Sequence, residues 1–100
     1  MPWYIVYEGR QRYRDGSVRP RVRVRELRGV PESARPRIIS QHYEAGDLWV
    51  TIEYRKRVRT RGGHYVVRTY RRDVHLGKGV RGSARLTRKP PEGPKVDRRR

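Results

Sequence analysis

The 100-residue chain contains no cysteine and no phenylalanine, and only 10 of its residues are aspartate or glutamate. The absence of cysteine excludes disulfides, thiolate metal ligands and a cysteine nucleophile. No apolar run approaches the roughly 18 residues that a membrane-spanning helix needs. The opening stretch MPWYIVYEG also lacks the basic region and cleavage site of a secretory signal. We therefore expect a soluble, cytoplasmic protein with no membrane partner.

Positive charge dominates the composition, because 27 Lys and Arg against 10 Asp and Glu give a formal net charge of +17 at pH 7. Arginine accounts for 23 of these residues and lysine for four. The planar guanidinium of arginine grips phosphate with two hydrogen bonds and stacks on flat rings. A GC-rich codon bias would raise the ratio of arginine to lysine, but it would not explain the scarcity of acids. Such an excess repels itself in a folded chain, and a polyanionic partner would relieve that repulsion.

Residues 1–76 alternate between β-rich runs and turn residues. WYIVYEG, from Trp3, leads to Asp15-Gly16, a favoured two-residue hairpin turn, and RPRVRVREL is the return strand. After a loop over residues 28–36, DLWVTIEYRKRVR and HYVVRTYRRDVHL flank Gly62-Gly63 as a second hairpin. The segment RIISQHYEAG fits a short helix or a strand, and we favour the strand. The pattern predicts a mostly-β domain, a small antiparallel sheet or barrel of four to five strands built from hairpins.

The alternation within the runs predicts which side chains face the core. In the return strand, Val18, Val22 and Val24 are expected to face inward, with the intervening arginines on the other side. In the run from Asp47, the inward set is expected to be Leu48, Val50, Ile52 and Tyr54. A sheet with one apolar face and one basic face follows from this assignment.

From Gly77 the composition changes, since residues 77–100 combine early glycines, late prolines and almost no apolar spacing. We expect a basic C-terminal tail, extended or disordered when free, that becomes ordered on a polyanion. GKGVRGSAR within it could wrap phosphate with backbone N–H groups, or serve only as a hinge. It is not a Walker loop, because the Lys-Ser/Thr pair is missing.

Arginines interleaved with aromatic rings are the strongest functional signal, since they offer charge to phosphates and flat faces to unpaired bases. Trp49 and Tyr70 are the best candidates for base stacking, and Tyr13 is the next. The alternatives are a solvated face that keeps the protein soluble and aromatic rings that fill the core. The predicted nucleic-acid-binding residues are Arg10, Arg12, Arg14, Arg19, Arg21, Arg23, Arg25, Trp49, Arg55, Arg57, Arg59, Arg68, Tyr70, Arg71, Arg72, Lys78, Arg81, Arg85, Arg88, Lys89, Arg98, Arg99 and Arg100.

Catalysis has little support in the sequence. The three histidines lie in different segments, with no carboxylate at metal-ligand spacing. His64, Tyr70 and His75 would be the residues to consider in a small basic ribonuclease of the toxin type, but nothing fixes a nucleophile and its base. We predict a protein that is not an enzyme, with no catalytic residues, metal, cofactor or small-molecule substrate.

The organisation of the whole chain resembles that of a small arginine-rich ribosomal protein of archaeal type. The resemblance lies in RPRVRVREL, RKRVRTRGGHYVVRTYRR and ARLTRKPPEGPKVDRRR. It implies a globular part on the surface of structured RNA, a basic tail that enters the RNA, and neighbouring ribosomal proteins as further partners. A chromatin or other architectural protein on duplex DNA in the nucleoid is the alternative. The tail's prolines and the many rings favour RNA, which presents unpaired bases and irregular pockets.

Overall fold

Strands make up most of the chain in the computed structural model, which describes residues 1–99. The strand content is 61% and the helix content 3%, which confirms the predicted mostly-β class. The described strands are β1 (Trp3–Arg12), β2 (Val18–Leu27), β3 (Arg37–Glu44), β4 (Asp47–Arg59), β5 (Tyr65–Gly77), β6 (Arg85–Thr87) and β7 (Val96–Asp97), with a 3-10 turn, η1 (Glu32–Ala34), between β2 and β3. The ambiguous segment before Gly46 is therefore a strand, as favoured.

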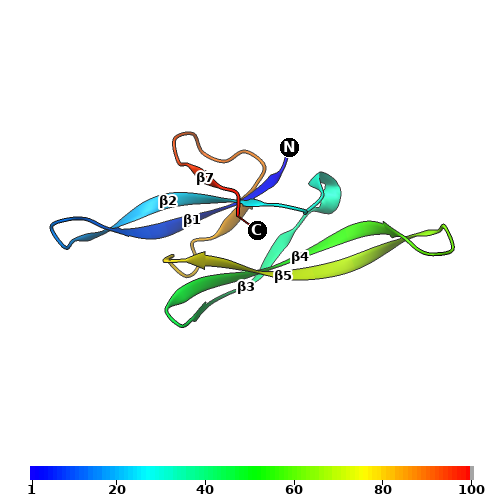
Figure 1. The fold of residues 1–100 in the computed structure, drawn as a ribbon, viewed down its shortest axis with the longest axis horizontal. Helices are drawn as coiled ribbons and strands as arrows, with labels where there is room; N and C mark the ends of the chain where they lie inside the picture. Colours follow the sequence, from blue (N-terminus) through cyan, green and yellow to red (C-terminus); the bar gives the residue numbers. More distant parts are fainter. Residues whose placement is uncertain (100) are drawn as a thin grey trace.

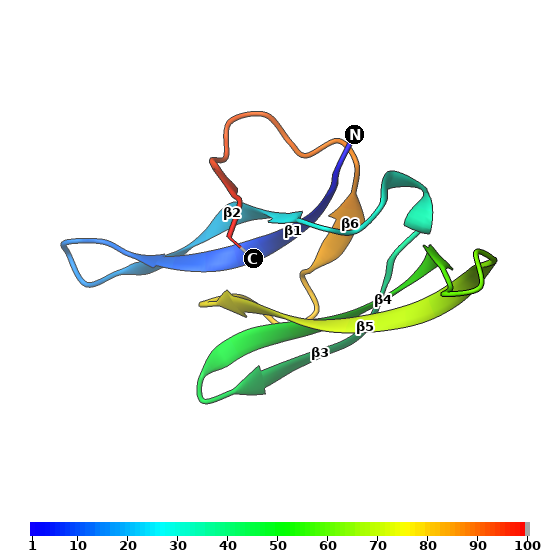
Figure 2. The ribbon, with the colours of Figure 1, turned by 45° about the vertical axis from the view of Figure 1, so that its right-hand side comes forward.

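Two open sheets replace the single sheet or barrel expected from the sequence. The first has the strand order β6-β1-β2-β7 and the second the order β3-β4-β5, and the described residues form no closed barrel. All neighbouring pairs are antiparallel except β2 and β7, which run parallel. Figures 1 and 2 show the two sheets as two layers. Within residues 1–99 no helix is long and apolar enough to cross a membrane.

The core lies between these layers. The inward set predicted for β4 is confirmed, since Leu48, Val50 and Ile52 are completely buried and Tyr54 nearly so. The first sheet contributes Ile5, Tyr7 and Leu27 to the same cluster. The Tyr7 hydroxyl donates a hydrogen bond to the Leu76 carbonyl at 3.1 Å, which ties β1 to the end of β5. Tyr7 is buried, and burial raises its pKa.

The inward set predicted for β2 is wrong. Val18 and Val22 are 52% and 48% exposed, whereas Arg25 is only 4% exposed. The register explains the difference, because Ile5 lies opposite Arg25 and residues directly opposite in an antiparallel pair share a face. Arg25 and Leu27 therefore point toward the second sheet, and Val24 is buried on the other face, beside β7.

The two long hairpins end in the same kind of loop. In the first loop the Tyr13 amide donates to the Ser17 carbonyl at 2.9 Å, and in the second the Thr60 amide donates to the His64 carbonyl at 2.7 Å. Gly16 and Gly63 have φ of 83° and 80°, the left-handed value that a three-residue hairpin loop requires at its third position. The turns are thus where the sequence predicts them, but each is one residue longer.

Residues 77–99 return along the first sheet, which differs from the expectation of a separate tail. β6 pairs with β1, and β7 pairs with β2. Earlier in the segment, the Arg10 amide donates to the Lys78 carbonyl and the Val80 amide to the Glu8 carbonyl, at 3.0 and 2.8 Å. Figure 1 shows this segment in orange and red, crossing over β1 and β2. Arg100 lies outside the described residues.

Candidate nucleic-acid interface

Two hairpin arms extend from the body of the molecule in opposite directions. We define the β1–β2 arm as residues 10–21 and the β4–β5 arm as residues 55–69. Neither contributes a residue to the hydrophobic core cluster. The molecule measures 62 × 29 × 19 Å, and the loops of the two arms lie at opposite ends of its longest axis (Figure 1). At its base the β1–β2 arm has one backbone bond outside the hairpin, from the Arg10 amide to the Lys78 carbonyl. Otherwise the strands of both arms are held by hairpin pairing and expose both faces.

The β4–β5 arm carries positive charge without any negative charge. No aspartate or glutamate occurs between Glu53 and Asp73. Antiparallel pairing keeps the arm a two-stranded ribbon, from the pair Arg55–Thr69 at its base to the pair Arg59–Tyr65 next to the loop. Six exposed cations lie on it: Arg55, Lys56, Arg57, Arg59, Arg61 and Arg68. None of the six has an ion-pair partner among the described residues.

The β1–β2 arm has a single carboxylate, and its loop already uses it. Asp15 accepts hydrogen bonds from the Ser17 hydroxyl at 2.6 Å and the Ser17 amide at 2.9 Å, and these bonds lower its pKa. Its second oxygen lies 4.0 Å from Arg19, a distance that gives a weak, exposed contact. The exposed arginines of this arm are Arg10, Arg12, Arg14, Arg19 and Arg21.

The single basic face predicted from the alternation does not form. Across the β1–β2 arm, Arg10 lies opposite Pro20 and Gln11 opposite Arg19. Successive residues of a strand point to opposite faces, so Arg10 and Arg12 are on one face and Arg19 and Arg21 on the other. Arg55, Arg57 and Arg59 belong to the other arm, on the face of the second sheet turned away from the core. The arginines are therefore grouped by arm and not by sheet face.

Each arm also carries an exposed tyrosine beside an arginine. The Arg19 guanidinium carbon is 4.9 Å from the centre of the Tyr13 ring, and that of Arg57 is 4.4 Å from the centre of the Tyr65 ring. Both rings are exposed. Sequence reasoning singled out Tyr13 but missed Tyr65, which the hairpin register places directly opposite Arg59.

The two rings first expected to stack on bases are placed differently. Tyr70 is half-buried at the edge of the core, where its ring stacks on Tyr54 with centroids 5.6 Å apart. Its prediction as an exposed platform is wrong, because the pairing of Tyr54 with Tyr70 puts both on the inner face. Trp49 lies off the core face as predicted, with its ring 4.6 Å from that of His75.

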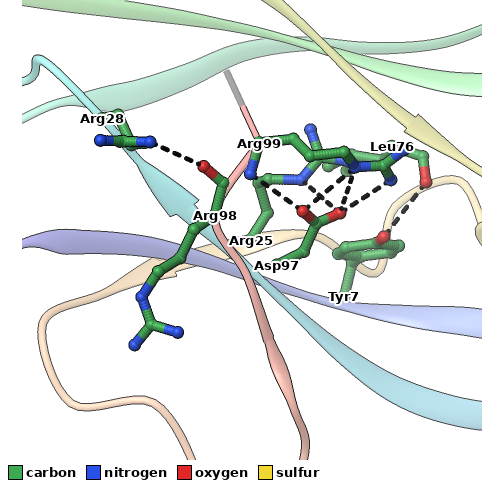
Figure 3. Close-up of polar contacts among 7 residues, drawn as sticks. All are labelled: Tyr7, Arg25, Arg28, Leu76, Asp97, Arg98 and Arg99. Atoms are coloured by element: carbon green, nitrogen blue, oxygen red, sulfur yellow. Dashed lines mark hydrogen bonds and ion pairs between the residues drawn. The ribbon is translucent and has the colours of Figure 1, made fainter.

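An ion-pair network around the buried Arg25 holds the C-terminal segment, and it includes two of the predicted phosphate ligands, Arg25 and Arg99. Asp97 lies between Arg25 and Arg99 (Figure 3), with its Oδ2 3.1 Å from Arg25 Nε and 2.8 Å from Arg99 Nη2. The hydrogen bonds from Arg99 are the main cause that lowers the pKa of Asp97 to about 2. Next to this network, Arg98 lies 3.4 Å from Glu26.

Most other predicted ligands outside the arms are also engaged within the protein. Arg72 donates to the Arg28 carbonyl at 2.6 Å, and Arg71 to Glu53 at 3.0 Å. The bonds from Arg37 and Arg71 lower the pKa of Glu53. Further cations have internal contacts of the same kind: Lys78 with Asp47, Arg81 with the Gln41 carbonyl, and Arg88 with the Glu32 carbonyl and the Trp3 ring. The Arg23 side chain packs over the backbone of Gly9. Arg85 and Lys89 are exposed on the C-terminal segment.

The residues considered for catalysis do not converge. His64 is in the loop of the β4–β5 arm, whereas His75 is near the far end of the 13-residue strand β5. His75 Nε2 lies 2.8 Å from Asp47 Oδ2, and this bond lowers the pKa of Asp47. Within residues 1–99 no cluster of His, Asp or Glu could hold a metal ion.

No protein-family model matches the chain, and no curated protein or solved structure proved similar to it.

Proposed function

We propose that the protein binds structured RNA, as a ribosomal or ribosome-associated protein, and that its two hairpin arms are the binding elements. The observation that carries this proposal is the β4–β5 arm, where six exposed cations are accompanied by no carboxylate. Charge of one sign on an element outside the core adds nothing to folding, and solubility would be served as well by mixed charge. A phosphate backbone gives this arrangement a use, because each neutralised phosphate releases counterions.

The shape of the arms suits a nucleic-acid groove or crevice. A two-stranded ribbon is narrow enough for the major groove of B-form DNA, which is about 12 Å wide, and it can also lie along the wide, shallow minor groove of an RNA helix. Arginines on both of its faces can reach the phosphates on either side. The exposed Tyr13 and Tyr65, each beside an arginine, could stack on unpaired bases. Unpaired bases favour RNA over duplex DNA as the ligand.

Duplex DNA remains a second candidate because of one feature of the β4–β5 arm. Val67 is 65% exposed and lies directly opposite Arg57. Architectural DNA-binding proteins insert apolar side chains between base steps while neighbouring arginines hold the phosphates. Under this alternative the protein would be a nucleoid component.

Salt-dependent binding tests the proposal. We would measure the affinity for a fluorescent RNA stem-loop of about 20 base pairs, and for a DNA duplex of the same sequence, from 50 to about 200 mM salt. The matched variants are Arg57→Glu and Lys95→Glu, which change net charge equally at exposed positions on the arm and on the C-terminal segment. We expect the Arg57 variant to bind several-fold more weakly, with a salt slope smaller by about 0.9, and the Lys95 variant to bind nearly as the wild type.

Three results would contradict the proposal or redirect it. Equal losses of RNA affinity in the two variants would mean that the protein's net charge, and not the position of the charge on the arm, determines binding. Affinity that does not change with salt would exclude phosphate contacts. Tighter binding to the DNA duplex than to the stem-loop would support the second candidate instead.

Two cellular and chemical controls complete the test. In a sucrose gradient of the native cell lysate, we expect co-migration with one ribosomal subunit that survives a high-salt wash. Sedimentation with DNase-sensitive material would contradict this. Labelled RNA should remain intact during the binding assay. Cleavage of the RNA by the wild type that is lost in the His75→Ala variant would show that the protein is a ribonuclease.

A further inference from the structure

We infer that one molecule binds two separate helical RNA segments at the same time, one on each arm, and so holds them at a fixed spacing. The inference rests on the proposed function. It adds two RNA-binding sites per molecule and a fixed spacing between them, which binding to RNA alone does not require.

The first argument is the placement of the arms. They belong to different sheets, and their loops lie at opposite ends of the 62 Å axis (Figure 1). The β4–β5 arm has five ladder pairs beyond the core, which at about 3.3 Å per residue give roughly 17 Å before the loop. Such a length lets the arm lie along the wide, shallow minor groove of an A-form RNA helix and contact the phosphates beside it without help from the rest of the protein.

The second argument is the distribution of charge between the arms and the body. Asp15 is the only carboxylate on either arm, and it is bonded within its own loop. All other carboxylates lie on the body: Glu8, Glu26, Glu32, Glu44, Asp47, Glu53, Asp73, Glu92 and Asp97. Several of them pair with the body's own cations, as Glu53 does with Arg37 and Arg71. Phosphate is therefore attracted most strongly to the two ends.

One continuous duplex laid along both arms is the competing arrangement. It would have to pass the carboxylates of the body, and it would need to be about as long as the protein. A duplex of 12 base pairs is no longer than about 41 Å at 3.4 Å per pair, so it cannot reach from one loop to the other. If such short duplexes bind at two per protein, each arm must hold its own.

The experiment uses two 12-base-pair RNA duplexes of identical sequence, one carrying a donor dye and one an acceptor. With wild-type protein at low salt, we expect energy transfer between them, rising with protein and falling again when excess protein gives each duplex its own partner. Native mass spectrometry should show one protein with two duplexes. Saturation at one duplex per protein would overturn bridging while leaving RNA binding intact, and a complex of two proteins with two duplexes would overturn it as well. Failure of the wild type to bind any RNA would instead refute the proposed function.

Arm variants assign each duplex to its arm. Arg57→Glu with Arg59→Glu alters one arm, and Arg10→Glu with Arg12→Glu makes the same change of charge on the other. Each should still bind one duplex, with energy transfer lost, and the combined variant should bind none. Full energy transfer in either double variant would refute the assignment. As a second form of the first variant, an Asn-Gly turn can replace residues 57–67, because Lys56 and Arg68 already lie opposite each other and the core lies outside the arm.

Discussion

Replacing Asp97 with asparagine should destabilise the protein, because the carboxylate is the counter-ion of a buried guanidinium. Arg25 is 4% exposed, and its Nε lies 3.1 Å from Asp97. Removing one partner of a buried ion pair costs about 3–5 kcal/mol, since the other charge is left without compensation. The Asp97 side chain is itself 27% exposed, so water screens part of the interaction. We expect a loss of about 2 kcal/mol, a large share of the roughly 5–15 kcal/mol typical of a domain this size.

Urea unfolding followed by circular dichroism at pH 7 measures this loss. Glu92→Gln is the matched control, an exposed carboxylate of the same segment, and should change the free energy of unfolding by less than about 0.5 kcal/mol. The double variant Arg25→Met with Asp97→Asn removes both charges and should recover most of the stability, because an apolar side chain is stable where an unpaired charge is not. If Asp97→Asn alone unfolds at the wild-type midpoint, or if the double variant is no more stable than the single one, the ion pair does not hold the C-terminal segment.

Three further predictions concern pH and packing. The pKa of Asp97 is lowered to about 2 from 3.8, so its stabilisation is complete above pH 3.8 and lost as the pH falls toward 2; the melting temperature should drop over that range, and less so in Asp97→Asn. Tyr7→Phe leaves the buried Leu76 carbonyl without its 3.1 Å donor and should cost about 1–2 kcal/mol in urea unfolding, whereas an unchanged midpoint would mean that water replaces the hydroxyl. Gly79→Ala would place a methyl 2.7 Å from the buried Leu48 Cδ2 and should cost about 1–3 kcal/mol; a neutral result would show that β4 can shift.

The sequence predicts β4 well and β2 poorly, and neighbouring strands explain why. In β4 one alternate set is apolar and the other polar, so only one orientation buries the apolar set. In β1, by contrast, Ile5, Val6 and Tyr7 are all buried, on both faces, so β1 gives its partner no preferred orientation. The register then places Arg25 inside, and its counter-ion Asp97 is too distant in sequence for any local pattern to reveal.

The candidate site was predictable in its chemistry and not in its shape. Composition alone predicts arginines as phosphate ligands, and the structure shows that many of them are exposed on the arms. The alternation rule fails there because the arms extend beyond the opposite sheet, and without a core on one side both faces of a ribbon can carry charge. The predicted ligands Arg25 and Arg99 instead bind Asp97, because the pairing of β2 with β7 brings Asp97 beside Arg25.

The pairing of β2 with β7 also sets the order in which the chain can fold. Arg25 is synthesised roughly 70 residues before Asp97, so at about 5–20 residues per second its counter-ion follows several seconds later. The β1–β2 hairpin can close on its own within microseconds. Until Asp97 arrives, burial of Arg25 against the second sheet would leave a charge without a partner. The β1–β2 hairpin should therefore form early but remain unpacked from the second sheet, with its arginines available to polyanions. It should pack against the second sheet only after the C-terminal segment has crossed it.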